Sequence, residues 1–464
     1  MLGLTTSQDS NTFWEQNYRR GVFSSHPNGA APLCAILSML PTDEPTPLHQ
    51  IGWMEERVEQ LRTKTVAGPT ALTVFYATGT TTSSGATVTP TAGTTYRIYL
   101  TDAQNTFQTD DVFRTQKLPL AAGGKTSVQF RVVSTGTNFV EAIAINTASG
   151  AVTNNAAAIV GVVALHQGSA FAEASKSRNG TSYYPTAIQN FTQIFKDAFS
   201  LSRHALKAPL VYNKSSDYER QLKRAGIKHM SGMEEAFLFG VKSESLEADV
   251  DNPGSTVRRT TVGGVDWYLQ QWEKGSVANG GAFNYRPGGA DLTAVTDFLA
   301  NPDKRRISLN DGSITMDAFV EMESLPFRKV NSMSTEKLCL CGHGYMSKVN
   351  ARYSKEFVNY KAPAEQFDTW NYKLISRETA NGTVYYKTHP LFNNPDHPMY
   401  NGAFYLDLGF TRMIPFLDQD TEVIEGIQAR DADLRKDMYM TEATLEVMFP
   451  ESMMVVQDLG GISL

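Results

Sequence analysis

Residues 183–240 read YYPTAIQNFTQIFKDAFSLSRHALKAPLVYNKSSDYERQLKRAGIKHMSGMEEAFLFG and decide the fold prediction. An apolar, strand-like stretch leads into one long helix, which we predict over 216–240. Ser216 and Glu219 have the spacing of a capping box, and Gly240 is a suitable stop. About 24 residues at a rise of about 1.5 Å each give a rod of roughly 36 Å. The stretch carries almost no catalytic chemistry and therefore indicates an architectural role.

The apolar stripe of this helix is thin. Gly226 and Gly232 interrupt it, so the helix cannot form a core of its own and must lie along an extended surface. The residues at the three-to-four spacing that defines the stripe are Tyr218, Leu222, Ala225, His229, Met233, Ala236 and Phe237.

The charges of the helix mostly oppose its macrodipole, with basic residues in the front half and acidic residues near the end. We expect some of them to meet charges on a neighbouring subunit; a solvated helix face is the alternative. The candidate subunit-contact residues are Arg220, Lys223, Arg224, Lys228, Glu234 and Glu235.

Composition limits the class of protein. The chain has 464 residues, 41% of them hydrophobic, which is enough for two or three globular domains. A net charge of -6 argues against nucleic-acid binding through a general basic surface. We see no secretory signal and no run of about 20 apolar residues, so we expect a chain made in the cytosol with no membrane contact. Three cysteines give no disulfide framework.

The chain changes character along its length. Residues 1–50 are rich in Pro, Ser and Asn and indicate an arm with one anchored apolar segment, APLCAILSMLP. Short runs of β-branched and aromatic residues between turn signals predict an all-β module over 66–165, including a buried strand within 156–165. Mixed helices and strands follow, with helices predicted within 291–303, over 313–327 and after the strand and turn of EKLCLCGH. Residues 404–464 return to strands.

Several clusters could carry chemistry, and each has a simpler interpretation. Cys339, Cys341 and His343 lack the second ligand pair of a metal site, so CLCGH indicates a buried strand end before a glycine turn. The acidic stretch 249–254 lacks the glutamate that closes a calcium loop.

The second histidine cluster, His389 with Asp396 and His397, has no nucleophile in a recognisable setting and indicates a Pro-rich loop. No phosphate-binding motif is present. We therefore predict no catalytic, cofactor-binding or metal site. We expect core or subunit-contact roles, not ligand stacking, for Trp53, Trp267, Trp272 and Trp370.

The order of these segments resembles the major capsid proteins of tailed bacteriophages, which share the Johnson fold. APLCAILSMLP and GWMEERVEQL are similar to that family's N-terminal arm and the ascending strand of its extended loop. AIQNFTQIFKDAFSLS resembles the descending strand, and SSDYERQLKRAGIKHMSGMEEAFLFG resembles the spine helix. VRRTTVGGVDWYL resembles the entry to the axial domain, and DADLRKDMYMTEATLEVMFPESMMVVQDL the closing strands of the peripheral domain.

The resemblance implies an α+β fold with an all-β insertion domain where the extended loop would turn. The implied parts are an N-terminal arm (1–50), an extended loop (51–65 and 166–200), the insertion domain (66–165), a peripheral domain (201–254 and 405–464, with spine helix 216–240) and an axial domain (255–404).

The resemblance also implies the function. The chain would assemble with itself into hexamers and pentamers that tile an icosahedral shell, enclosing double-stranded viral DNA without sequence-specific binding. It would be a virion protein assembled in the host cytoplasm, with portal, scaffold and cement or decoration proteins as further partners. The alternatives are another virion component, such as a tail or decoration protein, and a soluble enzyme with a β accessory module.

Overall fold

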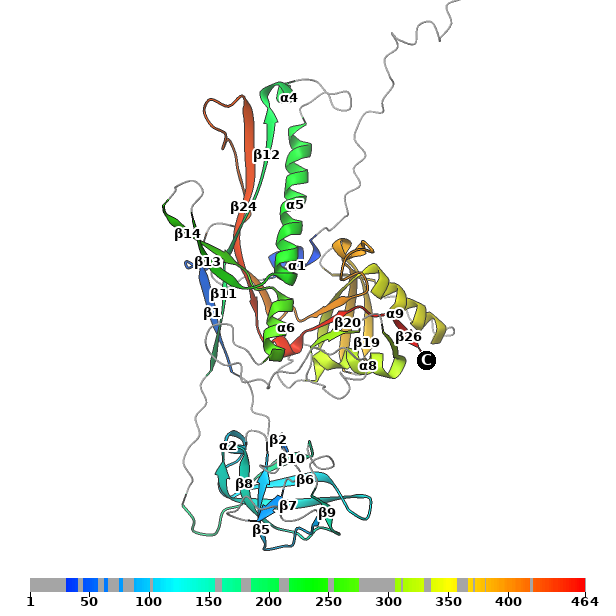
Figure 1. Cartoon of the computed structure of the whole chain (residues 1–464). Coiled ribbons are helices and arrows are strands. Elements are labelled where there is room, and N and C mark those ends of the chain that lie inside the picture. The colour runs from blue at the N-terminus through cyan, green and yellow to red at the C-terminus, as the bar shows by residue number, and fades with distance from the viewer. Residues whose placement is uncertain are drawn as a thin grey trace, which may run out of the picture. The chain divides into compact units, whose positions relative to one another are not determined.

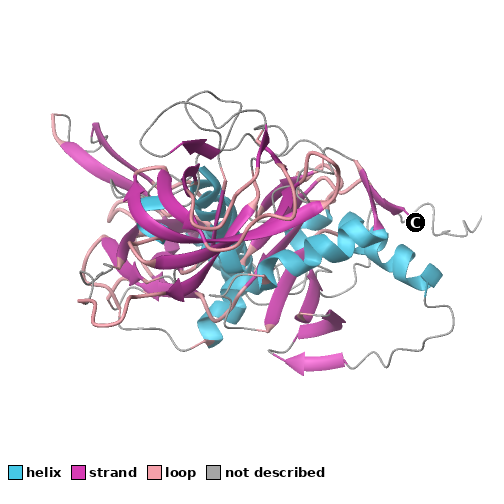
Figure 2. Ribbon diagram, turned by 90° about the horizontal axis from the view of Figure 1, so that it is seen from below, coloured by secondary structure: helices cyan, strands magenta, loops and turns pink. Residues whose placement is uncertain are grey.

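Two separately packed units make up the computed structural model: unit 1 comprises Met1–Glu56 and Pro185–Leu464, and unit 2 is Arg57–Tyr184. Helices and strands both contribute, so the fold is α+β (Figure 2). The structure describes residues 31–40, 45–56, 62–65, 75–77, 87–100, 103–154, 161–176, 185–207, 217–248, 254–274, 305–309, 312–328, 335–356, 366–369, 372–379, 381–417 and 420–463.

The long predicted helix is α5, which spans Tyr218–Phe239 and stands beside two long strands in Figure 1. The prediction of 216–240 is confirmed to within two residues at its start. Gly240 is the C-cap, and its N–H donates to the carbonyl oxygen of Ala236 at 2.8 Å. The helix therefore ends where the sequence predicted.

The start of α5 differs from the predicted capping box. Asp217 takes the N-cap position, but its side chain makes no capping hydrogen bond. The carboxylate binds the side chains of Arg220 and Gln221 instead. Ser216 lies outside the described residues.

A four-stranded antiparallel sheet packs against α5. Its central strand is β24 (Leu434–Val447), flanked by β12 (Gln193–Ser202), β22 (Thr411–Pro415) and β23 (Glu422–Ile424). Phe195 of β12 meets the rings of His229 and Phe237 of α5 edge-on. Residues of β12 alternate between half-buried and exposed, because α5 covers one face of the strand.

Shorter elements surround this layer. β1 pairs with β11 in antiparallel register, and the ribbon β13–β14 forms a sheet of its own. Their bounds are α1 (Pro32–Met39), β1 (Gln50–Glu55), β11 (Thr186–Phe191), α4 (Arg203–Lys207), β13 (Ser243–Ala248), β14 (Thr256–Thr261) and α6 (Val265–Lys274).

A seven-stranded mixed sheet forms the rest of unit 1, in the order β15-β25-β21-β17-β20-β19-β18. Helices α8 and α9 accompany it, and β16 pairs with β26 beside it. The bounds are β15 (Arg306–Ser308), β16 (Ser313–Thr315), α8 (Met316–Ser324), β17 (Glu336–Cys341), α9 (His343–Glu356), β18 (Gln366–Thr369), β19 (Tyr372–Thr379), β20 (Gly382–Thr388), β21 (Ala403–Leu406), β25 (Met454–Gln457) and β26 (Gly461–Ser463).

Strand β17 divides two hydrophobic cores. Leu338 and Leu340 face a core shared with α1, α5, α6 and β24, whereas Cys339 and Cys341 face a core shared with α8 and α9. Because successive side chains of a strand point to opposite faces, this sheet is buried on both sides. The interpretation of CLCGH as a buried strand before a glycine turn is confirmed, since Gly342 follows β17 and leads into α9.

Unit 2 has its own core and a seven-stranded sheet in the order β2-β10-β6-β7-β8-β5-β3. Val163–Ser169 forms β10, which shares only residues 163–165 with the buried strand predicted within 156–165. Ala164 is buried, whereas the rest of β10 is half-buried or exposed. Residues 156–160 lie outside the described residues. The bounds are β2 (Arg62–Lys64), β3 (Phe75–Ala77), β4 (Thr87–Val88), β5 (Thr95–Tyr99), α2 (Ala103–Thr106), β6 (Asp111–Pro119), β7 (Lys125–Gly136), β8 (Phe139–Ala144), β9 (Val152–Thr153) and β10.

Unit 1 is expected to fold without unit 2. Glu55 lies opposite Thr186 in the β1–β11 pair, so the segment between them leaves unit 1 and returns at adjacent positions. Replacing residues 56–185 with Asn-Gly, a two-residue hairpin turn, should leave the melting temperature of unit 1 within a few degrees of its value in the full chain. Calorimetry and circular dichroism test this expectation. Loss of the cooperative transition would contradict it.

One predicted helix differs from the structure, and two other predicted segments cannot be compared with it. The helix predicted over 313–327 begins with three strand residues, β16, because they pair with β26 near the end of the chain. The helix predicted within 291–303, and the acidic stretch 249–254 apart from Gly254, lie outside the described residues. Among the helices that the structure describes, none is both long and apolar enough to cross a membrane.

Candidate assembly regions

Two of the six candidate contact residues pair within the chain. Arg220 pairs with Asp217 one helical turn earlier, at 2.5 Å. Lys228 reaches Asp197 of β12 at 2.9 Å, and the buried His229 contacts the other oxygen of the same carboxylate at 3.1 Å. Burial raises the pKa of Asp197, but hydrogen bonds from Lys228 and His229 outweigh burial and hold that pKa below its usual value. These contacts hold α5 on its own sheet.

Three other candidates remain on the surface. Lys223, Arg224 and Glu235 are exposed on α5. None of the three forms an ion pair with another residue in the part of the chain that the structure describes. They are therefore the members of the predicted set that are available to a neighbouring subunit.

Glu234, a predicted candidate for subunit contact, lies in the interior of unit 1. Its side chain is 0% exposed. Its carboxylate oxygens accept the backbone N–H groups of Leu33 and Cys34 at 2.8 and 2.7 Å, and the ring of His389 contacts it at 2.8 Å. Glu234 is three residues before Phe237 and one after Met233, so it lies on the buried side of α5. The burial of Glu234 could therefore have been predicted from its spacing to Met233 and Phe237.

The face of β12 that α5 does not cover is open. Ile194 is 51% exposed, and Lys196 and Ala198 are also exposed. Met440 and Met438 lie opposite the latter two on β24 and are half-buried. This open face mixes apolar and charged groups.

The β13–β14 ribbon is exposed along its length. Every residue of β13 is exposed, with Leu246 at 70%. Cross-strand pairs join Glu244 to Arg258 at 2.9 Å and Glu247 to Arg259 at 2.7 Å. The ribbon contacts the rest of unit 1 through Thr260, whose Oγ1 donates to the carbonyl oxygen of Thr192 at 2.5 Å. Because its exposed apolar side chains gain when they are covered, this ribbon is a further region expected to gain from a neighbour. The exposed charges of α5, the open β12 face and the ribbon are called the candidate assembly regions below.

The cysteines do not form a reactive site. All three are buried free thiols. Burial raises the pKa of Cys34 and of Cys339 well above the ordinary thiol value, which keeps them neutral and poorly nucleophilic. Among the described residues, no group of three or more histidine, cysteine or acidic side chains could hold a metal ion.

The second histidine cluster is also separated. His389 is buried against Glu234, and Asp396 is exposed. Nδ1 of His397 accepts the N–H of Met399 at 3.1 Å, and burial lowers the pKa of His397. The three side chains do not converge on a common point of chemistry.

The tryptophans in the described residues belong to the packing of unit 1. Trp53 and Trp272 are members of the core beneath α5, and Trp267 packs against it. Trp370 lies outside the described residues. The prediction of core roles is confirmed for the three that can be compared.

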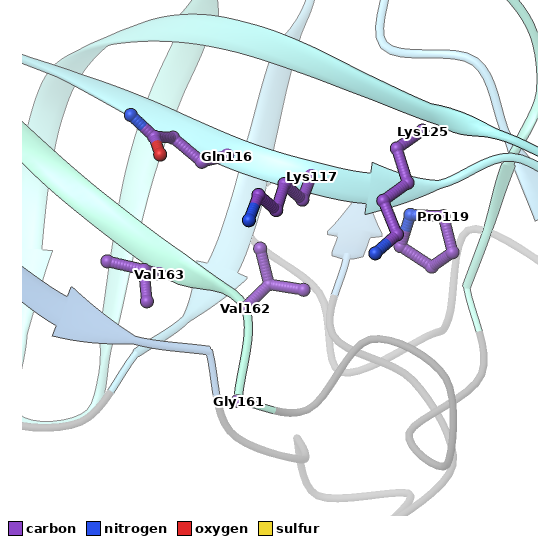
Figure 3. Close-up of a pocket in the computed structure, with 7 residues that line it drawn as sticks. All are labelled: Gln116, Lys117, Pro119, Lys125, Gly161, Val162 and Val163. Atoms are coloured by element: carbon purple, nitrogen blue, oxygen red, sulfur yellow. The ribbon is translucent and has the colours of Figure 1, made fainter. Parts of the chain in front are cut away.

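Unit 2 has a pocket of about 380 Å³. Figure 3 shows Lys117 and Lys125 at one wall and Val162 and Val163 at the opposite wall. None of the candidate residues predicted from the sequence lies in it. The lining residues are Gln116, Lys117, Pro119, Lys125, Gly161, Val162 and Val163.

The comparisons with known proteins place the chain in a class. The family model of the SU10 major capsid protein matches residues 5–460. No curated protein matches the chain.

Solved structures of low similarity include the capsid asymmetric unit of cyanophage A-1(L), 14% identical, with a TM-score of 0.37 over 63% of this chain and 84% of that one. Mycobacterium phage Adephagia gives 8% identity and a TM-score of 0.38 over 100% and 99% of the two chains. Mycobacterium phage Bobi gives 8% identity and a TM-score of 0.38 over 95% of this chain and 92% of that one.

The chain is a major capsid protein, a structural virion component that forms the icosahedral shell of a phage, and not an enzyme. It belongs to the SU10 major capsid protein family, whose model covers nearly its whole length. The resemblance to tailed-phage capsid proteins is confirmed. The tail, decoration and enzyme alternatives are set aside.

Proposed function

We propose that the chain assembles into hexamers and pentamers that tile the shell around double-stranded DNA, which it encloses without reading its sequence. The observation that carries the proposal is the family match over residues 5–460. The candidate assembly regions support it, because exposed apolar side chains such as Ile194 and Leu246 gain when a neighbour covers them.

The proposed assignment of residues to domains follows the arrangement of the family. The arm would be residues 1–50, the extended loop 51–65 and 166–200, and the insertion domain 66–165. The peripheral domain would be 201–254 and 405–464, and the axial domain 255–404. The pairing of β1 with β11 supports the loop, since it brings residues 50–55 and 186–191 together as a hairpin base. Portal, scaffold and cement or decoration proteins would be further partners.

Electron microscopy of the overexpressed chain tests the function directly. Shells, tubes or hexamers are the expected result. A monodisperse monomer under all conditions tried would contradict assembly by this chain alone.

The exposed charges of α5 are proposed to contact a neighbouring subunit. The double variant Lys223→Glu with Arg224→Glu should reduce the yield of assembled particles about tenfold or more. In the proposed interface, the new glutamates would face the acidic groups of the neighbour that the basic side chains are expected to meet. The free energy of unfolding of the variant should stay within about 0.5 kcal/mol of the parent value, because both side chains are exposed. Particle yield by sedimentation and stability by thermal melting are the two measurements.

A matched control is available in unit 2. Lys117→Glu with Lys125→Glu makes the same change in net charge at exposed positions. Normal assembly of this control beside failed assembly of the α5 variant would support the contact. An equal loss in both would assign the effect to net charge, and normal particles from the α5 variant would remove these residues from the interface.

A further inference from the structure

Helix α1 has no N-cap side chain of its own. Ala31 takes the N-cap position and Pro32 opens the helix. The first N–H groups of a helix have no partner within it. Here two of them, from Leu33 and Cys34, donate to separate oxygens of Glu234, about 200 residues later in the chain. A carboxylate at this end also favours the positive pole of the helix.

His389 completes the environment of the carboxylate. Its Nδ1 accepts the N–H of Leu391 at 3.2 Å, so the ring hydrogen belongs on Nε2, which donates to Oε1 of Glu234 at 2.8 Å. The imidazole is 0% exposed and stacks on Phe392 with ring centroids 4.2 Å apart. Three donors from two distant segments therefore converge on one buried carboxylate.

Helix α1 is short and is held by distant residues, among them the joint formed by Glu234 with the N–H groups of Leu33 and Cys34. It has eight residues, and a helix of that length is not stable alone in water. Leu33, Ile36 and Leu37 are almost fully buried in the core beneath α5. Formation of α1 and its docking on unit 1 are thus one event, and both require that its first N–H groups find acceptors.

We propose that Glu234 is the positioning residue of the N-terminal arm. Its carboxylate sets the equilibrium between a docked α1 and an open segment 31–40, and so fixes the point at which the arm joins the subunit body for assembly. This role rests on the proposed assignment of residues 1–50 as the arm. Glu235, the next residue, is exposed and makes no such contact among the described residues.

The variant Glu234→Gln tests the proposal with little change in shape. Both carboxylate oxygens accept N–H groups, whereas an amide offers one oxygen and one NH₂ group. One backbone donor of α1 must then face another donor, which leaves it unsatisfied. Glu235→Gln is the matched control at the neighbouring position.

The natural residue Cys34 allows opening of the segment 31–40 to be measured. It lies in α1 and is buried, so an alkylating reagent such as N-ethylmaleimide reaches it only after the segment opens. Cys339 and Cys341 are buried in the other core and report opening of the remainder of unit 1. Peptide mapping of the unassembled full-length chain distinguishes the three sites.

In Glu234→Gln we expect Cys34 to react about tenfold faster or more, since loss of one satisfied buried donor shifts the opening equilibrium by about that factor. Cys339 and Cys341 should keep their rates, and Glu235→Gln should behave like the parent. His389→Gln keeps both acceptors for α1 and removes only the ring contact, so a smaller acceleration at Cys34 is expected. If Glu234→Gln does not fold, the His389→Gln variant is used for the test instead.

Electron microscopy of the same variants then tests the role in assembly. Fast Cys34 labelling together with fewer closed shells supports the proposal. Unchanged labelling overturns it, as does equal acceleration at all three cysteines, which would reflect global stability. Fast labelling with a normal yield of shells overturns the assembly role. A parent chain that forms no particles would contradict the proposed function, while Cys34 labelling still tests the joint.

Discussion

Replacing Asp407 with asparagine is expected to lower the free energy of unfolding of unit 1 by about 3–5 kcal/mol, the usual cost of removing one partner of a buried ion pair. Lys337 and Asp407 pair with both side chains 0% exposed. Oδ1 of Asp407 also accepts the N–H of Gly409 at 3.1 Å. The variant removes the Asp407 counter-charge from the buried Lys337 ammonium. Chemical denaturation of the full chain measures the loss.

The pH dependence of this variant has a definite sign. Burial lowers the pKa of Lys337 below 10.5, and Asp407 opposes that shift. Without Asp407 the folded-state pKa falls further, so the unfolded chain binds more protons between the lowered pKa and about 10.5. Stability therefore rises with pH in that window. The Asp407→Asn variant should recover part of its loss as the pH is raised from neutral toward 10, relative to the parent.

Two controls sharpen the result. Glu247→Gln breaks the Arg259 pair on the ribbon, where the side chains are 59% and 49% exposed, and should cost no more than about 1 kcal/mol. Lys337→Met with Asp407→Leu removes both charges and should be much less harmful than Asp407→Asn alone. A double variant as unstable as the single one would contradict the assignment to loss of the counter-charge.

Replacing Gly342 with alanine is expected to destabilise unit 1 by about 3 kcal/mol, near the upper end of the usual cost of overpacking. Gly342 joins β17 to α9, and its N–H donates to the carbonyl oxygen of Gly402 at 2.9 Å. An added Cβ would overlap the carbonyl oxygens of Met399 and Tyr400. Backbone atoms cannot turn aside as a flexible side chain can, so strand, helix or loop must shift.

Gly232→Ala is the matched control for this substitution. A Cβ at Gly232 meets nothing within 4 Å, and the position lies in the middle of α5. Alanine should therefore stabilise the helix by about 0.5–1 kcal/mol. Thermal melts of the two variants should move in opposite directions. A harmless Gly342→Ala would mean that the β17–α9 junction is looser than its geometry indicates.

Features set by local sequence were predictable. The apolar spacing of α5 and its stop at Gly240 allowed the helix to be read from the local sequence. The same holds for β17, Gly342 and α9, where a β-rich run meets a glycine and then a helical pattern. In such segments local preference and tertiary packing agree.

Features set by distant partners were not predictable in the same way. Segment 32–39 was expected to be anchored, but its helical form and the acceptor of its first N–H groups, Glu234, could not be read from the local sequence. Residues 313–315 became a strand because the chain end pairs with them. Each case depends on a contact that spans much of the chain.

The joint at Glu234 also has a consequence for the order of synthesis. Residues 32–39 leave the ribosome well before Glu234, which is 201 positions beyond Leu33. At about 5–20 residues per second, translation of that interval takes roughly 10–40 s, and His389 follows later still. During this time α1 has neither its acceptors nor its core. The segment is therefore translated early and docked late, so an incomplete chain does not present a docked arm to finished subunits.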